Sequence, residues 1–167
     1  MLKAALLAVI LLACTAVGRS LSNARRRRAE TLNELLAAMR VLRLRMLNSM
    51  EPLGILLRKS DARLFRQLGN ELRAGANLWD CWKERRAIET RRGGLLDSLA
   101  SGDIAILDGF FKNLGGSGRE EQSELFAGVI AEMEEAQGQA RRSYADASRI
   151  YTALGTLVGI GLCVLIV

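Results

Sequence analysis

Uncharged, strongly apolar residues occupy both ends of the chain, and every acidic residue lies between them. The first apolar run covers residues 4–18, and the second covers residues 151–167. A helix that spans a bilayer needs roughly 17 to 25 apolar residues, so both runs are at the short end of that range. Basic and aromatic side chains at their borders can reach the membrane surface. We therefore expect transmembrane helices at 1–19 and 150–167.

Between these runs, apolar residues recur at intervals of three and four, which is typical of amphipathic helices, and no alternating strand pattern occurs. The clearest stripe consists of Leu32, Leu35, Met39, Leu42 and Met46. Helices are expected from about 21 to 48, from 52 to 59, from 61 to before 75, from 77 to 92, from 103 to 114, and from 117 onward. The predicted fold class is all-α: a compact bundle of about six helices over residues 20–149, flanked by the two transmembrane helices.

Local chemistry marks where several of these helices begin. Pro52 suits the first turn of a short helix, because its fixed φ is helical and its missing N–H is not needed there. Asn77 and Asp103 are expected to cap the fourth and fifth helices. Ser117 and Glu120 have the spacing of a capping box, which predicts the start of the last helix.

The composition excludes several classes of chemistry. The chain has no His and three Cys, so it cannot build a Ser-His-Asp or Cys-His nucleophile system, a His metal site or a four-thiolate zinc site. The loop at residues 115–118 is rich in Gly, but it joins two helices, and Arg119 stands where a phosphate loop would have Lys. We expect no enzyme activity and no catalytic, metal or cofactor site.

Positive charges at the membrane borders predict the orientation of the chain. Basic residues follow the first apolar run and precede the second; they are Arg19, Arg25, Arg26, Arg27 and Arg28, and Arg141, Arg142 and Arg149. Such residues stay on the cytosolic side, which places residues 19–150 in the cytosol. The first five are expected to set topology and to bind anionic lipid head groups. Nucleic acid is not an expected partner, because no aromatic residues interleave with the arginines.

The N-terminal run also allows a second interpretation. A short basic start followed by an apolar core resembles a cleavable signal peptide ending near Gly18, and residues 11–14 form a loose lipoprotein box that ends in Cys14. Under this alternative the protein is a secreted or lipid-anchored helical binding protein. For the C-terminal run, the alternative is a helix buried in the core.

Charge is divided unequally between the two halves of the central region. Residues 20–92 contain 17 Lys and Arg against 8 Asp and Glu, whereas residues 93–148 contain 4 against 10. Either the two halves lie side by side in one monomer, or acidic and basic faces meet between subunits, so a homo-oligomer is possible. A solvated charged surface is the simpler alternative. Trp79 and Trp82 share one helix face and are candidates for a partner-facing patch, with core packing as the alternative.

This layout resembles the stage III sporulation protein AB family over essentially the whole chain. The most informative segment is Leu114–Gln122, which resembles the family's Leu-Gly-x-Ser-Asp-Arg-Glu-x-Gln pattern, with Gly118 in place of Asp. Glu51-Pro52-Leu53 lies where the family has a Thr-Pro-Leu step, and Tyr151–Gly155 resembles its Tyr-x-x-Leu-Gly entry to the last anchor.

The resemblance implies a non-enzymatic scaffold in a secretion-like channel complex between mother cell and forespore. The expected location is the mother-cell membrane around the forespore. The expected partners are other stage III sporulation membrane proteins and a cytosolic secretion-type ATPase, because the cytosolic domain is similar to the platform protein of type II secretion and type IV pilus machines. We place contacts on Arg119, Glu120 and Gln122, with ordinary capping and helix surface as the alternative.

Overall fold

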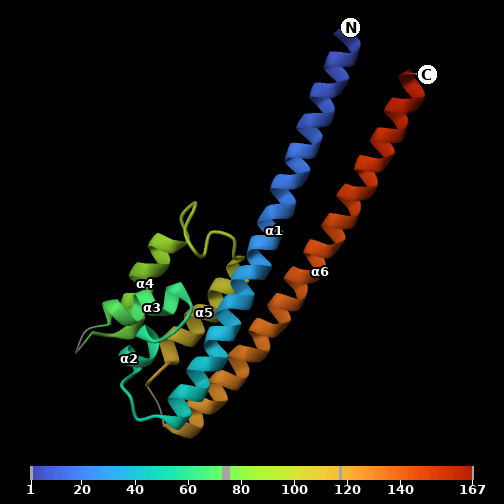
Figure 1. The fold of residues 1–167 in the computed structure, drawn as a ribbon. Helices are drawn as coiled ribbons and strands as arrows, with labels where there is room; N and C mark the ends of the chain where they lie inside the picture. The colour runs from blue at the N-terminus through green and yellow to red at the C-terminus, as the bar shows by residue number, and fades with distance from the viewer. Residues whose placement is uncertain (1, 73–75, 117, 167) are drawn as a thin grey trace. The chain divides into compact units, whose positions relative to one another are not determined.

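The structure is a computed structural model of the chain, shown in Figure 1. It describes the backbone of residues 2–72, 76–116 and 118–166, and the side chains of residues 23–72, 76–116 and 118–146. Its described part contains six helices and no strand: α1 Leu2–Asn48, α2 Leu53–Arg58, α3 Arg63–Glu71, α4 Leu78–Glu89, α5 Ser101–Asn113 and α6 Arg119–Ile166. This confirms the prediction of an all-helical protein.

The chain divides into two compact units. One consists of residues 1–29 and 139–167, and the other, which we call the bundle, consists of residues 30–138. The predicted transmembrane helices at 1–19 and 150–167 lie outside the residues whose side chains are described. In the part of the chain that was described, no helix is long and apolar enough to cross a membrane.

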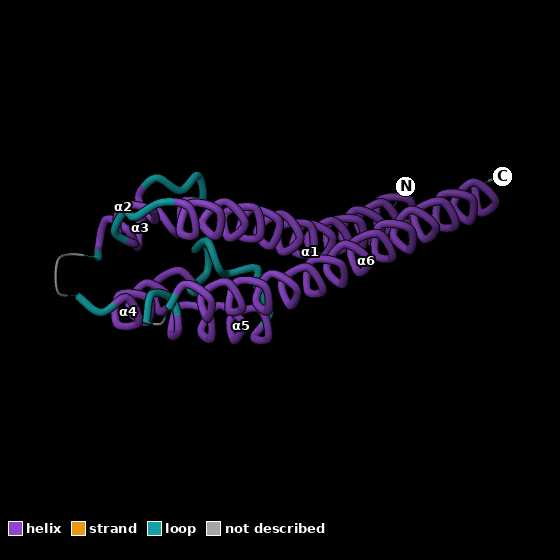
Figure 2. The backbone as a smooth tube through the Cα atoms, turned by 90° about the horizontal axis from the view of Figure 1, so that it is seen from below, coloured by secondary structure: helices purple, strands orange, loops and turns teal. Residues whose placement is uncertain are grey.

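Within the bundle, the end of α1 and the start of α6 are antiparallel neighbours. The Gln137 amide donates to Asn33 Oδ1 at 2.6 Å, Arg40 Nη2 pairs with Glu134 Oε1 at 2.5 Å, and an Arg43 guanidinium nitrogen lies 3.4 Å from Ser123 Oγ. Residue numbers rise on α1 as they fall on α6, so residues 30 and 138 lie at the same end of the bundle. In Figure 2, α2 and α3 lie on the α1 side of the bundle and α4 and α5 on the α6 side.

Aromatic rings contributed by four helices fill the centre of the bundle. Phe111 stacks on Trp82 of α4 with ring centroids 4.5 Å apart, and it meets Phe65 of α3 edge-on at 5.6 Å. Phe110 meets Phe126 of α6 at 5.3 Å. All five side chains are at most 1% exposed. Aromatic pairs in such geometries add roughly 0.5 to 1.5 kcal/mol each to the gain from apolar burial.

The stripe predicted on the first helix lies mostly in this core. Leu32, Leu35, Met39 and Leu42 are all at most 3% exposed, as is the neighbouring Leu36, whereas Met46 is half-buried. Residues at these intervals share one face of the helix, and that face packs on the other helices of the bundle. The apolar periodicity therefore identified the buried face, except at its last position.

Two of the predicted helix starts match the structure closely. Asn77 is the N-cap of α4, and its Oδ1 accepts a hydrogen bond from Trp79 N at 2.9 Å. Pro52 immediately precedes α2 as its N-cap residue, one position earlier than the predicted first turn. Both residues act through local backbone chemistry, which is why the sequence alone indicated them.

The other two predicted starts differ in detail. Asp103 lies inside the first turn of α5, where its carboxylate accepts from Ala100 N at 2.8 Å; it is therefore not the N-cap. At the start of α6, Glu121 Oε2 accepts from Gly118 N at 3.3 Å. The glutamate whose side chain accepts from the backbone N–H at the helix start is therefore Glu121, one residue later than the predicted Glu120. Ser117 lies outside the described residues.

Helices α2 and α3 approach each other closely at Gly69. A Cβ atom built on this glycine would lie 2.5 Å from Arg58 N and 2.9 Å from the Leu57 carbonyl carbon. Contacts this short involve backbone atoms, so a side chain here would push the two helices apart. Gly109, on the exposed face of α5, has no atom within 4 Å of the same position.

These two glycines give a matched test of the packing. Gly69→Ala is expected to lower the free energy of unfolding by about 1 to 3 kcal/mol, because it overpacks the α2–α3 contact. Gly109→Ala is expected to raise it by roughly 0.5 to 1 kcal/mol, because alanine is the better helix former and nothing obstructs it. Urea unfolding of both variants measures the difference. Equal stability of the two variants would contradict the close approach of α2 and α3.

Candidate interaction surface

Trp82, one of the two candidate partner-facing tryptophans, is fully buried. It is 0% exposed, stacks on Phe111, and donates from Nε1 to Asp108 Oδ1 at 2.7 Å. Arg86 Nη1 pairs with the other oxygen of the same carboxylate. The core-packing alternative therefore describes Trp82, whose polar atom is satisfied inside the protein.

Trp79, the other candidate, lies at the edge of the core and is half-buried. The Lys83 ammonium group lies 5.8 Å from the centroid of its ring, within the range of a cation–π contact. Lys83 also pairs with Asp80 at 2.8 Å. Of the two tryptophans, only Trp79 can be reached from the surface of the bundle.

Gln122 closes the turn between α5 and α6 and is not on the surface. It is 3% exposed. Its Nε2 donates to the Asn113 carbonyl at 3.1 Å, and its Oε1 accepts from Gly115 N at 3.1 Å. Gly115 has a φ of +81°, which favours glycine, so the amide of Gln122 stabilises a sharply bent connection. Gln122 is thus a positioning residue for the start of α6.

Arg119 and Glu120 are exposed at the first two positions of α6. They lie at the end of the bundle where α1 ends, because a Cβ atom on Gly115 would lie 3.0 Å from Leu53 Cδ2. We call this end, made of residues 44–53, 114–116 and 118–123, the tip. Two large apolar side chains are exposed there: Leu44 is 62% exposed and Met50 is 97% exposed. The tip thus combines exposed charged side chains with exposed apolar side chains.

The roles of Gln122 and Arg119 can be separated by stability. Gln122→Leu is expected to lower the free energy of unfolding by about 1 to 3 kcal/mol, because it removes the two hydrogen bonds that hold Asn113 and Gly115 in the turn. Arg119→Ala is expected to change it by no more than roughly 0.5 kcal/mol, as for most surface substitutions. Urea unfolding provides the measurement. A Gln122→Leu variant as stable as the parent would show that the turn does not depend on this amide.

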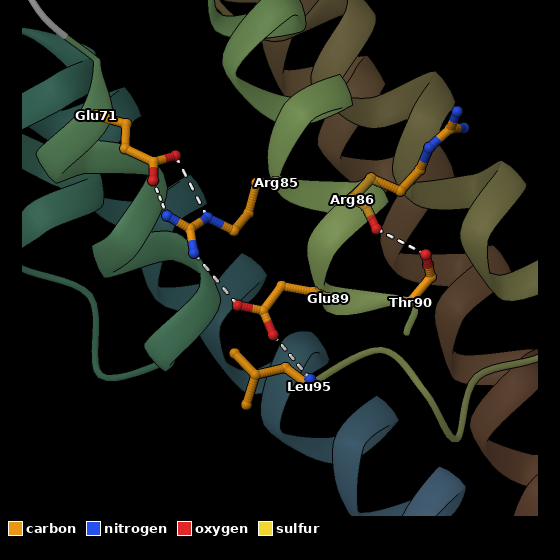
Figure 3. A network of polar contacts seen from close by, with 6 residues as sticks. All are labelled: Glu71, Arg85, Arg86, Glu89, Thr90 and Leu95. Atoms are coloured by element: carbon orange, nitrogen blue, oxygen red, sulfur yellow. Dashed lines mark hydrogen bonds and ion pairs between the residues drawn. The ribbon is translucent and has the colours of Figure 1, made fainter. Parts of the chain in front are cut away.

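A partly buried ion network that the sequence did not predict connects α3 and α4 (Figure 3). Arg85 Nε lies 3.3 Å from Glu71 Oε2, and a second guanidinium nitrogen pairs with the other oxygen of Glu71. Arg85 also contacts Glu89 at 3.4 Å. The side chains of Arg85 and Glu89 are only 17% and 11% exposed, so each charge depends on its partners.

The same network fixes the connection between α4 and α5. Glu89 Oε2 accepts from Leu95 N at 2.9 Å, and its backbone carbonyl accepts from Leu96 N at 2.9 Å. Gly94 passes so close that a Cβ atom there would overlap the Glu89 carbonyl oxygen. The four-residue spacing of Arg85 and Glu89 was visible in the sequence, but Glu71 and Leu95 reach them only through the fold.

The arginine run near the first apolar segment lies on the other unit. Arg25, Arg26 and Arg27 are exposed and Arg28 is half-buried. Arg19 lies outside the residues whose side chains are described. Within the described residues, no group of three His, Cys, Asp or Glu could hold a metal ion. The expectation of no enzyme activity stays a prediction.

Comparison with known proteins identifies relatives by sequence and by fold. A family model described as "Stage III sporulation protein AB" matches residues 3–167. One solved structure, described as stage III sporulation protein AB, matches with a TM-score of 0.58 and 16% sequence identity, over 71% of this chain and 97% of that chain. Identity this low shows a shared fold and nothing finer. No curated protein matches the chain.

Proposed function

The chain belongs to the stage III sporulation protein AB family, and we propose that it is a non-enzymatic membrane platform of the secretion-like complex between mother cell and forespore. It is a sporulation protein by family. The platform role is our proposal, and its main support is the extent of the family match, which includes both apolar ends together with the bundle between them. A platform subunit needs these two parts: segments that hold it in a membrane and a folded surface that receives a partner.

The proposed membrane segments are the two apolar ends, in the mother-cell membrane around the forespore. Each belongs to a helix that continues into the bundle without a break: α1 is 47 residues long and α6 is 48 residues long. Because α1 and α6 are antiparallel in the bundle, the chain enters and leaves the bundle at one end. That arrangement suits two segments in a single membrane, and the basic residues beside both runs favour a cytosolic bundle.

The proposed docking surface for the cytosolic secretion-type ATPase is the tip. It consists of the ends of α1 and α6 that are farthest along the chain from the apolar segments. Arg119 and Glu120 provide exposed charges that steer association, and Leu44 and Met50 provide apolar area that gains from being covered. The Gln122 amide holds the turn beneath them. Other stage III sporulation membrane proteins are the proposed partners of the apolar segments.

The docking surface can be tested with a charge-removal variant. Replacing Arg119 and Glu120 together by Ala is expected to reduce capture of the partner ATPase about tenfold or more. The charged groups of the ATPase that pair with them would stay in the interface without a partner, which costs about 2 to 5 kcal/mol of binding free energy. Capture is measured by pull-down with the full-length protein in detergent, across a range of ATPase concentrations.

A matched control removes the same two kinds of charge elsewhere. Glu84→Ala with Arg91→Ala changes exposed positions on α4 and in the segment that follows it, away from the tip. This variant is expected to capture the ATPase as the parent does. Unchanged capture by the Arg119 and Glu120 variant would remove these residues from the interface, and equal loss in both variants would attribute binding to overall charge.

The orientation of the bundle can be tested with protease. In intact protoplasts of sporulating cells, residues 30–138 are expected to resist added protease, because the bundle faces the cytosol, and to be digested once detergent opens the membrane. Immunoblotting of the fragments gives the result. Digestion in intact protoplasts, with a mature chain that begins near Arg19 or at a lipid-modified Cys14, would instead indicate the secreted or lipid-anchored protein.

A further inference from the structure

Four consecutive arginines, residues 25–28, surround α1 beyond the N-terminal apolar run; we call them the arginine collar. Successive residues turn by about 100° around an α-helix, so the four side chains cover about 300° of its circumference. Three of them are exposed and the fourth is half-buried. No side of the helix can pack into apolar protein at this level without burying a guanidinium, which is costly. The collar therefore needs polar or anionic surroundings on nearly every side.

The uninterrupted helix fixes the distance between the collar and the apolar run. The collar begins seven residues and ends ten residues after Gly18, which is about 10 to 15 Å at 1.5 Å per residue. A lipid head-group layer is roughly 5 to 7 Å thick on each side of the hydrocarbon. If the apolar run ends at the hydrocarbon boundary, the collar lies just outside the head groups, within about one Debye length of 8 to 10 Å.

The direction in which the arginine side chains extend differs between α1 and α6 relative to the apolar runs. The Cα–Cβ bonds of an α-helix tilt toward its N-terminus, and long side chains continue in that direction. On α1 the apolar run is N-terminal to the collar, so the arginines lean toward the membrane. On α6, Arg141 and Arg142 lie at a similar distance, ten and nine residues before Tyr151, but the apolar run is C-terminal to them. Those two side chains lean away from the membrane.

We propose that the collar on α1 binds the phosphate groups of anionic phospholipids, and that Arg141 and Arg142 contribute much less. Arginine is suited to this contact, because its planar guanidinium can donate two hydrogen bonds to one phosphate. The inference rests on the proposed membrane insertion of the apolar ends. To the head-group binding expected from the sequence it adds the phosphate as the group bound and an asymmetry between the two helices. Arg25 and Arg27 lie on different sides of α1 and are exposed, so both are placed to reach lipid.

The experiment uses the full-length chain in vesicles of phosphatidylcholine that contain a minor fraction of phosphatidylglycerol. Spin-labelled lipids report the preference of the protein for phosphatidylglycerol over phosphatidylcholine. Arg25→Gln is expected to lower this preference by roughly twofold to fivefold, and Arg25→Gln with Arg27→Gln further. Arg141→Gln removes the same charge from an exposed position on α6 and is expected to lower it by less than half as much. High salt is expected to reduce the preference of the parent protein.

The outcomes separate this inference from the proposed function. Insertion is measured first, by carbonate-resistant flotation with pure phosphatidylcholine vesicles; failure to insert overturns both. A chain that inserts but shows no phosphatidylglycerol preference, or that loses it equally in the Arg25→Gln and Arg141→Gln variants, overturns the inference alone. The inference is also overturned if duplex DNA binds the parent protein but not the Arg25 and Arg27 double variant, while that variant keeps the lipid preference. Circular dichroism confirms that every variant keeps the helical fold of the parent.

Discussion

Two adjacent phenylalanines of α5 join the helices of the bundle, and the rest of the bundle depends on them. Consecutive helix positions differ by about 100°, so Phe110 and Phe111 point in different directions from one element. Phe110 reaches Phe126 of α6, and Phe111 reaches Trp82 of α4, with Phe65 of α3 in contact with both. With these two large apolar side chains, the short helix α5 contacts three other helices. The long helices supply the frame, and α5 joins α3 and α4 to it.

The unequal charge of the two halves has a partial explanation inside the monomer. Arg40 pairs with Glu134, and Arg86 pairs with Asp108, so each pair links a residue of the basic half to one of the acidic half. The Arg40–Glu134 pair is about half exposed, and such surface pairs contribute little to stability. The Arg86–Asp108 pair matters more, because the same carboxylate accepts from the indole of Trp82. Internal pairing therefore accounts for particular contacts between the two halves.

The sequence predicted best those features that depend on neighbouring residues. Periodicity gave the helices and the buried face of α1, and Asn77 marked a helix start through its own side chain. The sequence predicted less well those features whose position depends on the residue at which a helix begins. The glutamate that caps α6 is Glu121, because the helix begins at Arg119 and not one residue earlier. Helical geometry placed Trp79 and Trp82 on one face. However, three residues turn by about 300°, which leaves the two side chains about 60° apart around the helix, and this difference puts Trp82 in the core and Trp79 at its edge.

Features made by distant residues could not be predicted. Glu71, Arg85 and Leu95 meet only because α3, α4 and the segment after α4 fold together, and no local pattern indicates that meeting. In the candidate site, too, some residues could be identified from the local sequence and others only from the fold. Arg119 and Glu120 could be identified as surface residues from their place at a helix start, whereas Gln122 belongs to the turn because Asn113 and Gly115 are folded back toward it. The Gln122 amide is 3% exposed and hydrogen-bonds within the turn through both its nitrogen and its oxygen, so a partner at the surface does not reach it. In the proposed docking at the tip, a partner contacts the exposed side chains of Arg119 and Glu120, and Gln122 acts by holding the turn beneath them.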